Sequence, residues 1–263
     1  MTMFIIAAIA LAGGVALFFV SRSLSSKVLE IGGTETSTAA SLKELGASVA
    51  KEIGSGSFAQ KAEVKGKALA IESLTADFSG TEVVWYECTV TREWEEEYYE
   101  KDKDGNRERH TRRGSETVSS VLREPPFNIE DATGKFLIDP RGAKVESEQT
   151  WSSFESGAGG TSLRVGSFVL DALAFAAGAR RTIGYRFEEH SIPVGRELYV
   201  LGEASDVAGS LRMRKPDKGR FLISTRSEEE ILKGTKSGVI GTQIGAAVLA
   251  ALAVVCLIVG LLQ

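Results

Sequence analysis

The chain has 263 residues and a formal net charge of -4, with acidic and basic side chains mixed along its length. This length accommodates one large domain or two small ones. Because no stretch is strongly basic, the composition argues against a nucleic-acid-binding protein.

An uncharged apolar run from Met3 to Val20 begins the chain. A helix of this length rises about 27 Å, which is close to the minimum for crossing a bilayer core. A cleaved signal peptide is the alternative. No Lys or Arg precedes the run and no clear small-residue cleavage site follows it, so we expect a transmembrane helix over residues 1–21.

Residues 22–61 are predicted to be a juxtamembrane linker that contains one amphipathic helix. Four aliphatic residues recur there at spacings of three and four: Leu42, Leu45, Val49 and Ile53. This spacing indicates one face of a helix over about 38–53, which Ser and Thr can cap and Gly54–Ser57 can end. The stripe is narrow and lacks a basic, aromatic-rich face, which favours packing on the next domain over lying on the membrane.

Residues 62–236 are predicted to form an α+β domain, β-rich, with a few short helices. Strands are expected over 62–73 and 81–100. In the second of these, alternate residues face one side of the strand: Val84, Tyr86, Cys88, Val90 and Trp94. A turn at Asp104 and Gly105 followed by a returning strand over 110–122 predicts a long, polar-tipped β-hairpin.

Charged residues fill this hairpin, with EWEEEYYE on one strand and RERHTRR on the other. One interpretation is an acidic binding strip. The other, which we favour, is pairing of opposite charges across the two strands. The DKDGN segment at 102–106 resembles the start of a calcium loop, but the basic residues after it favour a plain turn.

The stretch PPFNIEDATGKFLIDPRGAKVE, residues 125–146, carries three carboxylates: Glu130, Asp131 and Asp139. Strands over 127–129 and 135–138 are predicted, joined and followed by turns with the sequences DATG and DPRG. Asp in such turns bonds to nearby backbone amides, and Gly permits positive φ. A metal site is the alternative, but the stretch has no His or Cys, so we expect structural roles.

The remaining elements of the domain are predicted from apolar runs and turn residues. GAGG at 157–160 is expected to be a loop, and residues 165–178 a short helix. Two strands should flank a turn at Pro193–Gly195, and a hairpin should turn at Pro216–Gly219. Ser227 should cap a short helix that leads into a second transmembrane helix over residues 237–263.

Basic residues flank both apolar runs on their inner sides: Arg22, Lys27, Arg226, Lys233 and Lys236. The positive-inside rule therefore predicts that the middle domain is cytoplasmic. Cys88 lies in this domain and Cys256 in the second span, so no disulfide between them is expected.

The chain has two His residues, His110 and His190, and it lacks the set of three or four closely spaced Cys and His residues that a common zinc site needs. No nucleophile elbow, P-loop or dinucleotide fingerprint is present. His190 beside Glu189 could serve as an acid–base pair, but a solvated surface His is the simpler interpretation. We therefore predict no catalytic, cofactor-binding or metal-binding residues, and no enzyme.

Four stretches in order between the two spans resemble the GIDE domain, also called the BAM (beside a membrane) domain: SGTEVVWYECTV, PPFNIEDATGKFLIDPRGAKVE, YRFEEHSIPVGRELYVLGEA and FLISTRSEEEIL. This domain is known from membrane-anchored RING ubiquitin ligases of the MULAN or MAPL type. That family has a span, a domain of this size, a second span and then a RING.

The resemblance implies a RING-less, prokaryotic-type member, because no RING follows the second span before Gln263. It then implies an integral cell-membrane protein that acts as a non-catalytic interaction, sensing or scaffold module, linked to stress in one interpretation. The alternatives are the substrate-binding part of a ubiquitin ligase system and an unrecognised hydrolase. The expected partners are the lipid bilayer and an unidentified protein, with homo-oligomers left open, and neither nucleic acid nor a cofactor.

Overall fold

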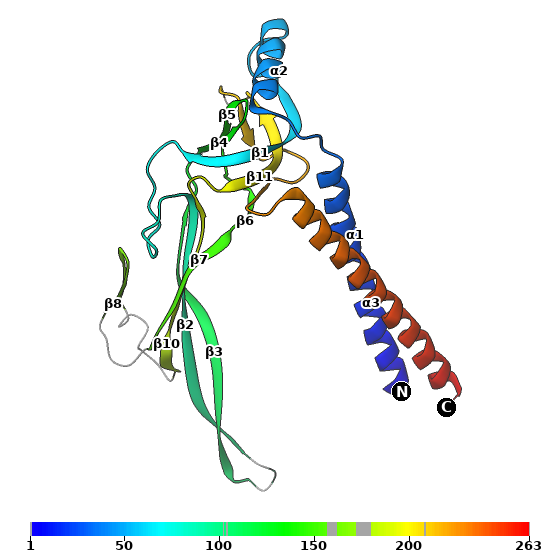
Figure 1. The fold of residues 1–263 in the computed structure, drawn as a ribbon. Coiled ribbons are helices and arrows are strands. Elements are labelled where there is room, and N and C mark those ends of the chain that lie inside the picture. Colours follow the sequence, from blue (N-terminus) through cyan, green and yellow to red (C-terminus); the bar gives the residue numbers. More distant parts are fainter. Residues whose placement is uncertain are drawn as a thin grey trace. The chain divides into compact units, whose positions relative to one another are not determined.

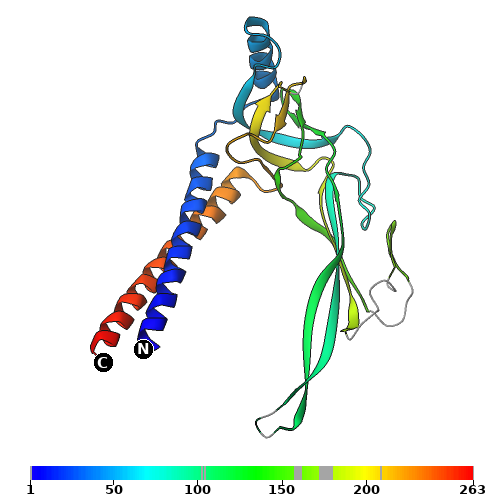
Figure 2. The ribbon, with the colours of Figure 1, turned by 180° about the vertical axis from the view of Figure 1, so that it is seen from behind.

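The computed structural model describes residues 2–101, 103, 105–156, 162–171, 180–207 and 209–262, and Figures 1 and 2 show it from opposite sides. The chain divides into two compact units. The first contains Met1–Ser37, Lys61–Glu63 and Arg226–Gln263, and the second contains Thr38–Gln60 and Val64–Thr225.

Two long helices, α1 (Thr2–Gly32) and α3 (Glu228–Leu262), dominate the first unit and lie side by side in both views (Figures 1 and 2). Glycines bring them close: a Cβ added to Gly245 would lie 3.0 Å from a methyl carbon of Leu17. Both helices are long and apolar enough to cross a membrane.

The segment after Ser227 begins α3 and is not a separate short helix, so that prediction was wrong. The predicted cap is present. Ser227 Oγ accepts a hydrogen bond of 3.2 Å from the Glu230 amide, and the Glu230 carboxylate accepts one of 3.2 Å from the Ser227 amide. The helix runs unbroken into the apolar run because no Pro or positive-φ Gly interrupts it among its described residues.

Helix α2 (Ala39–Glu52) confirms the predicted amphipathic helix. Thr38 caps its first turn together with Ser41, and the chain leaves the helix at Gly54, whose φ of 115° favours glycine. Leu42 is fully buried within the second unit, whereas Leu45 and Ile53 are exposed.

Five strands of the second unit close into a small barrel: β1 (Ala59–Ala70), β4 (Phe127–Asp131), β5 (Gly134–Ile138), β12 (Arg212–Arg214) and β11 (Glu197–Ser205). They pair in the order β1-β4-β5-β12-β11, and β11 pairs back to β1. With β5 and β12 parallel, this connectivity is that of an OB-type barrel. Its interior holds fully buried apolar side chains, among them Phe127, Ile129, Phe136, Ile138 and Met213.

Strands β13 (Leu222–Ser224) and β6 (Lys144–Glu146) continue this sheet beyond β11. The predicted hairpin that turns at Pro216–Gly219 is therefore wrong. Strands β12 and β13 do not pair with each other, because β11 lies between them and pairs with both.

A second, four-stranded sheet has the order β3-β2-β10-β7, with β2 (Val83–Lys101), β3 (Arg107–Arg123), β7 (Glu148–Ser156) and β10 (Arg180–Pro193). Strands β2 and β3 confirm the predicted long hairpin, seen as the paired long arrows in Figure 1. Tyr86, Cys88 and Val90 share a core with Tyr185 and Phe187 of β10, as the alternation predicted.

A hairpin of β8 (Ser162–Val165) and β9 (Phe168–Asp171) occupies the first part of the predicted helix at 165–178, so that prediction was wrong for residues 165–171. Phe168 packs on the aromatic core instead, with its ring 5.5 Å from that of Phe78. Residues 172–178, the GAGG loop at 157–160 and Asp104 lie outside the described residues.

Candidate functional site

The distal half of the four-stranded sheet, here called the ribbon, comprises residues 92–101 of β2, 107–116 of β3, 180–186 of β10 and 154–156 of β7. Strand alternation gives the ribbon two faces. The first carries four β2 side chains in line with the core: Arg92, Trp94, Glu96 and Tyr98. The second carries the alternate ones: Glu93, Glu95, Glu97 and Tyr99.

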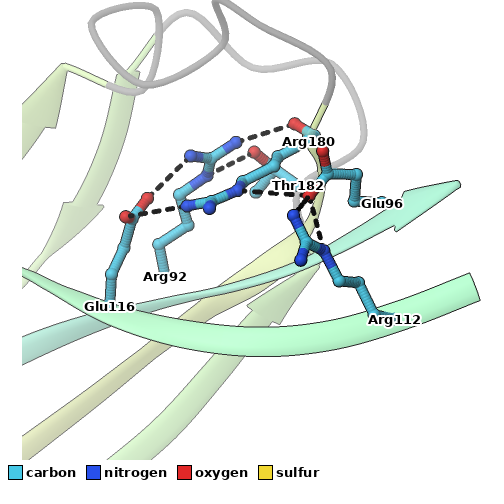
Figure 3. A network of polar contacts seen from close by, with 6 residues as sticks. All are labelled: Arg92, Glu96, Arg112, Glu116, Arg180 and Thr182. Atoms are coloured by element: carbon cyan, nitrogen blue, oxygen red, sulfur yellow. Dashed lines mark hydrogen bonds and ion pairs between the residues drawn. The ribbon is translucent and has the colours of Figure 1, made fainter. Parts of the chain in front are cut away.

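Arg92 is the buried centre of the first face, with only 5% of its surface exposed. Its guanidinium donates to the Thr182 hydroxyl at 2.8 Å, to the Glu116 carboxylate at 2.8 Å and to the backbone carbonyl of Arg180 at 2.9 Å (Figure 3). These contacts join β2, β3 and β10. A buried guanidinium is tolerated because its donors are paired and hydrogen-bonded.

A sandwich of glycine, tryptophan and arginine lies beside this centre. The Trp94 ring covers Gly114 on the neighbouring strand, where an added Cβ would come within 2.5 Å of the indole. The guanidinium of Arg180 also lies over the ring, 4.1 Å from its centroid. Arg180 is in turn 3.5 Å from Glu96, which also binds Arg112 (Figure 3).

The second face repeats this sandwich with different residues. An added Cβ at Gly184 would lie 2.4 Å from the Phe154 ring, so Phe154 crosses the bare backbone of its neighbour strand. Arg186 lies 5.5 Å over this ring and donates to Glu93 at 2.7 Å. Aromatic rings over strand glycines are a known means of stabilising sheets, and an arginine over the ring adds a cation–π contact.

The glutamates and arginines of the ribbon are paired across strands, as one of the two sequence interpretations predicted. Glu95 accepts from Arg181 at 3.0 Å and lies 3.5 Å from Arg113. The hydrogen bond from Arg181 holds the pKa of Glu95 below its ordinary value. Since these carboxylates already have cationic partners, the acidic-strip interpretation is not supported.

Aromatic surface remains exposed among these charges. Tyr99 is 65% exposed, Phe154 42% and Tyr98 40%. Tyr98 stacks on His110 of the opposite strand with 5.5 Å between ring centroids. Tyr and Arg together are the residue types that protein-binding surfaces favour.

Asp131 serves the turn, as predicted, and also a helix. It accepts hydrogen bonds from the amides of Thr133 (2.7 Å) and Gly134 (3.0 Å) and from the amide of Ala39 in the first turn of α2 (2.7 Å). Burial opposes its ionisation, but the bonds from Thr133, Ala39 and Gly134 outweigh this and hold its pKa below the ordinary value. No pattern in the sequence indicated the contact with α2.

Asp139 also binds within its own turn, where it accepts from Arg141 Nε at 2.7 Å. That bond, against the opposing effect of burial, lowers the pKa of Asp139. Glu130 lies 3.9 Å from Lys135 of the next strand. Within the described part of the chain, no group of three His, Cys, Asp or Glu side chains is placed to hold a metal ion.

Glu189 is completely buried and does not form a pair with His190, because the two residues face opposite sides of β10. Its carboxylate accepts from the amides of Phe78 (2.9 Å) and Ser79 (3.0 Å) and from the hydroxyl of Thr150 (2.9 Å). Burial opposes ionisation of Glu189, but the bonds from Ser79, Phe78 and Thr150 hold its pKa below the ordinary value.

Cys88 lies 3.7 Å from this carboxylate. Burial, together with the charges of Glu189 and Asp77, raises the pKa of the Cys88 thiol to about 12. The thiol is therefore protonated at neutral pH, and neither cysteine is in a disulfide. An inward-facing Glu or Arg in an otherwise apolar strand face was the only sequence signal for Glu189 and Arg92.

An open groove of about 460 Å³ runs between β1 and β4 of the barrel. Its charged lining is mixed: Lys65, Lys67, Glu130, Asp131 and Glu197. Gly66 forms its floor, where an added Cβ would lie 2.3 Å from the Glu130 carbonyl oxygen. Carboxylates in this lining do not suit a polyanion such as a nucleic acid.

The chain thus combines a β-rich domain with two flanking helices that are long and apolar enough to cross a membrane, an architecture consistent with a membrane protein. The GIDE family model, described as E3 ubiquitin ligase, matches residues 95–259, which is more than half of the chain. The chain therefore belongs to the GIDE family, as the resemblance predicted.

Two curated relatives are both from Arabidopsis thaliana. E3 ubiquitin-protein ligase SPL1 is 28% identical over 123 residues, covering 43% of this chain and 32% of the relative. E3 ubiquitin-protein ligase SP1 is 28% identical over 128 residues, covering 45% and 33%. The chain thus matches about a third of the length of each relative, and no solved structure matches it.

Proposed function

We propose that this chain is a membrane-anchored, non-catalytic recognition module in which α1 and α3 cross the membrane and the ribbon binds a partner protein. The ribbon carries this proposal. Its two faces combine a buried three-strand arginine centre, paired charges and exposed aromatic rings, which together offer a firm and chemically specific surface.

Surface exposure of the two long helices supports anchoring. Only 11% of the most apolar window of each helix is buried among the described residues. A helix in the core of a soluble protein would have this surface covered by protein. Exposed residues such as Ile9, Phe19, Ile244 and Val248 fit a hydrocarbon environment.

The buried and partly buried polar groups described above already have hydrogen-bond partners, and this supports recognition over catalysis. The Glu189 carboxylate is occupied by three donors and has no exposed surface. Asp131 is held by backbone amides. The thiol of Cys88, which lies beside the Glu189 carboxylate, is protonated. A catalytic acid, base or nucleophile needs access to substrate within hydrogen-bonding reach, which these groups lack.

Site-specific photocrosslinking in native membranes tests the ribbon. A photoreactive phenylalanine analogue is placed at Tyr99 or Phe154, and at the exposed Val207 as a control outside the ribbon. We expect a discrete protein adduct from the two ribbon positions and none from Val207. Equal adducts at all three positions, or none from the ribbon, would contradict the proposal.

A charge swap then separates surface recognition from folding. The pair Glu97 and Arg109 bridges the two hairpin strands. Glu97→Arg combined with Arg109→Glu keeps the pair but reverses its pattern, so we expect the hairpin to persist and the adduct from Tyr99 to weaken. An unchanged adduct would show that this part of the surface does not select the partner.

A second candidate is the substrate-binding part of a ubiquitin ligase system, and the names of the two relatives favour it. The chain has two Cys and two His, fewer than the two zinc sites of a RING require. We therefore expect less than about 0.1 zinc per chain and no ubiquitin transfer by the purified chain alone. Autoubiquitination, or one equivalent of zinc that survives mild chelation, would refute this expectation.

The ribbon is proposed to face the cytoplasm, on the grounds of the basic residues beside both spans. A cysteine introduced at the exposed Glu72 can report this with a membrane-impermeant maleimide, because Cys88 is buried and protonated and gives little background. We expect labelling of intact cells only after permeabilisation. Labelling without permeabilisation would place the domain outside.

A further inference from the structure

A groove of about 340 Å³ lies between α1 and α3 inside the helical unit. Polar groups line it: Ser21, Arg22 and Ser25 from α1, and Gln243 from α3. Phe18 and Ala246 add an apolar wall. The α1 residues of this lining lie where the apolar run of α1 gives way to the polar stretch SRSLSSK, residues 21–27.

None of these four polar side chains has a hydrogen-bonding or ionic partner among the described residues, although 95% of the surface of Ser21 is buried. Other polar side chains of α3 behave differently. The hydroxyls of Thr235, Ser237 and Thr242 donate to carbonyls of their own helix, at 2.7 to 3.0 Å. The groove therefore gathers donors whose acceptor must come from outside the protein.

The contacts between the helices fix the depth of the groove. The helices run antiparallel: Gly245 lies against Leu17, and Gly238 lies against Leu24. The groove falls between these two contacts, where the uncharged run Met3–Val20 ends. If the helices span a bilayer, this is the depth at which hydrocarbon gives way to phosphate groups.

A guanidinium at this depth is stabilised by an anion, because an unpaired charge close to hydrocarbon is costly. A lipid phosphate meets this need, since it can accept a paired hydrogen bond from Arg22 and further bonds from the serine hydroxyls and the Gln243 amide. No acidic side chain lines the groove, and Lys236 lies near the same helix end. The local field is positive, so a net negative headgroup is preferred to a zwitterionic one.

The open side of the groove identifies a lipid as the source of this phosphate. Arg22 and Gln243 are exposed, and Phe18 is 58% exposed beside them. In a bilayer this surface meets lipid, so an occupant would enter sideways with its chains along the apolar helices.

We propose that the groove between α1 and α3 binds the headgroup phosphate of an anionic phospholipid. The inference rests on the proposed membrane anchoring. It assigns to Arg22 the role of phosphate ligand and to Gln243 that of a second donor, and it makes the anchor selective for the lipid composition of its membrane.

Native mass spectrometry of the full chain in neutral detergent tests this, with phosphatidylglycerol as the probe and phosphatidylcholine as the reference lipid. We expect one retained phosphatidylglycerol per chain and no retained phosphatidylcholine. Arg22→Gln should weaken the retained complex about tenfold to a hundredfold, the effect of losing a hydrogen bond to a charged group. Gln243→Leu should weaken it severalfold while making α3 more apolar, so loss of membrane insertion cannot explain the result.

Lys236→Gln is the matched control, because it removes one positive charge near the same helix end without touching the groove. We expect a change of at most about fivefold, typical of an exposed charge. Equal effects of Arg22→Gln and Lys236→Gln would overturn the site and leave only general attraction. Displacement of phosphatidylglycerol by excess inorganic phosphate would also overturn it, because the ligand would then be a free anion.

Carbonate extraction of the same membranes distinguishes the two proposals. Release of the wild-type chain into the supernatant would refute membrane anchoring itself. A chain that stays in the pellet but shows no preference for phosphatidylglycerol would refute only the lipid site.

Discussion

Removal of the Glu189 carboxylate should destabilise the domain that carries the ribbon. Two variants separate its charge from its shape. Glu189→Gln keeps an oxygen facing the amides of Phe78 and Ser79, and its NH2 group can donate to Thr150 once that hydroxyl turns. Glu189→Met is of similar size but leaves both buried amides without an acceptor.

The two variants should differ in magnitude. Leaving a buried amide unsatisfied costs about 1–3 kcal/mol, so Glu189→Met should lower the free energy of unfolding by about 2–5 kcal/mol. Glu189→Gln replaces charge-assisted bonds by neutral ones, which are roughly half as strong, and also relieves the burial of a charge. We expect a loss of about 1–2 kcal/mol.

Tryptophan fluorescence during denaturation of the full chain in detergent measures these values. All three Trp residues, Trp85, Trp94 and Trp151, belong to the second unit, and Trp151 lies 5.5 Å from the Phe78 ring. Glu188→Gln is the control, since Glu188 is the neighbouring residue on the opposite face of β10, and it should change stability by no more than about 0.5 kcal/mol. The reasoning fails if Glu189→Met is no worse than this control.

The pH dependence gives an independent measurement of the same group. The folded pKa of Glu189 is depressed, so the stability that its ionised form contributes is present above the ordinary pKa of a glutamate and is lost as pH falls through the folded value. Glu189→Gln should flatten the acid limb of the stability curve. An unchanged acid limb in this variant would assign the acid sensitivity to other carboxylates.

Three further predictions concern local contacts. Gly114→Ala should force the Trp94 indole away from β3, shift Trp emission and cost about 1–3 kcal/mol in the same denaturation assay; an unshifted spectrum would contradict the Gly114–Trp94–Arg180 packing. Asp131→Ala should lower the protection of the α2 amides in hydrogen exchange by about 1 kcal/mol, increasingly so above the depressed pKa of Asp131, whereas unchanged protection would remove its capping role. Gly66→Ala should lower the free energy of unfolding by about 1–3 kcal/mol, because the added Cβ meets the Glu130 carbonyl. Gly234→Ala is the control: its Cβ meets nothing within 4 Å, so the change should be neutral or slightly stabilising. Equal effects of the two variants would argue against the close approach of β1 and β4.

Local patterns predicted those parts of the fold that neighbouring residues determine. The spacing of Leu42 to Ile53 predicted α2, and strand alternation predicted the inward residues of β2. Turn chemistry predicted that Asp131 and Asp139 accept hydrogen bonds from backbone amides two residues further on, those of Thr133 and Arg141. In each instance, the partners lie within a few residues along the chain or repeat with the period of the element.

Local sequence patterns could not predict which distant segments pair with each other. The segments around 212–214 and 222–224 and the turn between them look like a hairpin, but β11 separates the two strands. Similarly, the first part of 165–178 has the apolar composition of a helix, whereas contact of Phe168 with Phe78 favours a strand. Competition from a partner far along the chain decides such segments, and local propensity carries no information about it.

In the candidate site too, contacts between segments close in sequence were predicted, whereas contacts between distant segments were not. Charge pairing across the hairpin was predicted, because β2 and β3 are adjacent in sequence and their charges are opposite. The two arginines that lie over the aromatic rings, Arg180 and Arg186, were not predicted. They come from β10, about ninety residues further along the chain than the β2 glutamates they contact. Only the three-dimensional sheet places a glycine, a ring and a guanidinium in one stack.

The extent of β10 also explains how the ribbon can be both firm and adaptable. Strand β10 supports β2 as far as the pair Arg180 and Glu96, whereas β2 and β3 continue together to the pair Lys101 and Arg107. A two-stranded hairpin is only marginally stable in water. Its outer part therefore depends on cross-strand contacts such as the stack of Tyr98 on His110, each worth a fraction of a kcal/mol to about 1 kcal/mol. Because the Arg92 centre fixes the base and weak pairs hold the outer part, we expect that the proposed partner could reshape the end of the hairpin around Tyr99 at little cost.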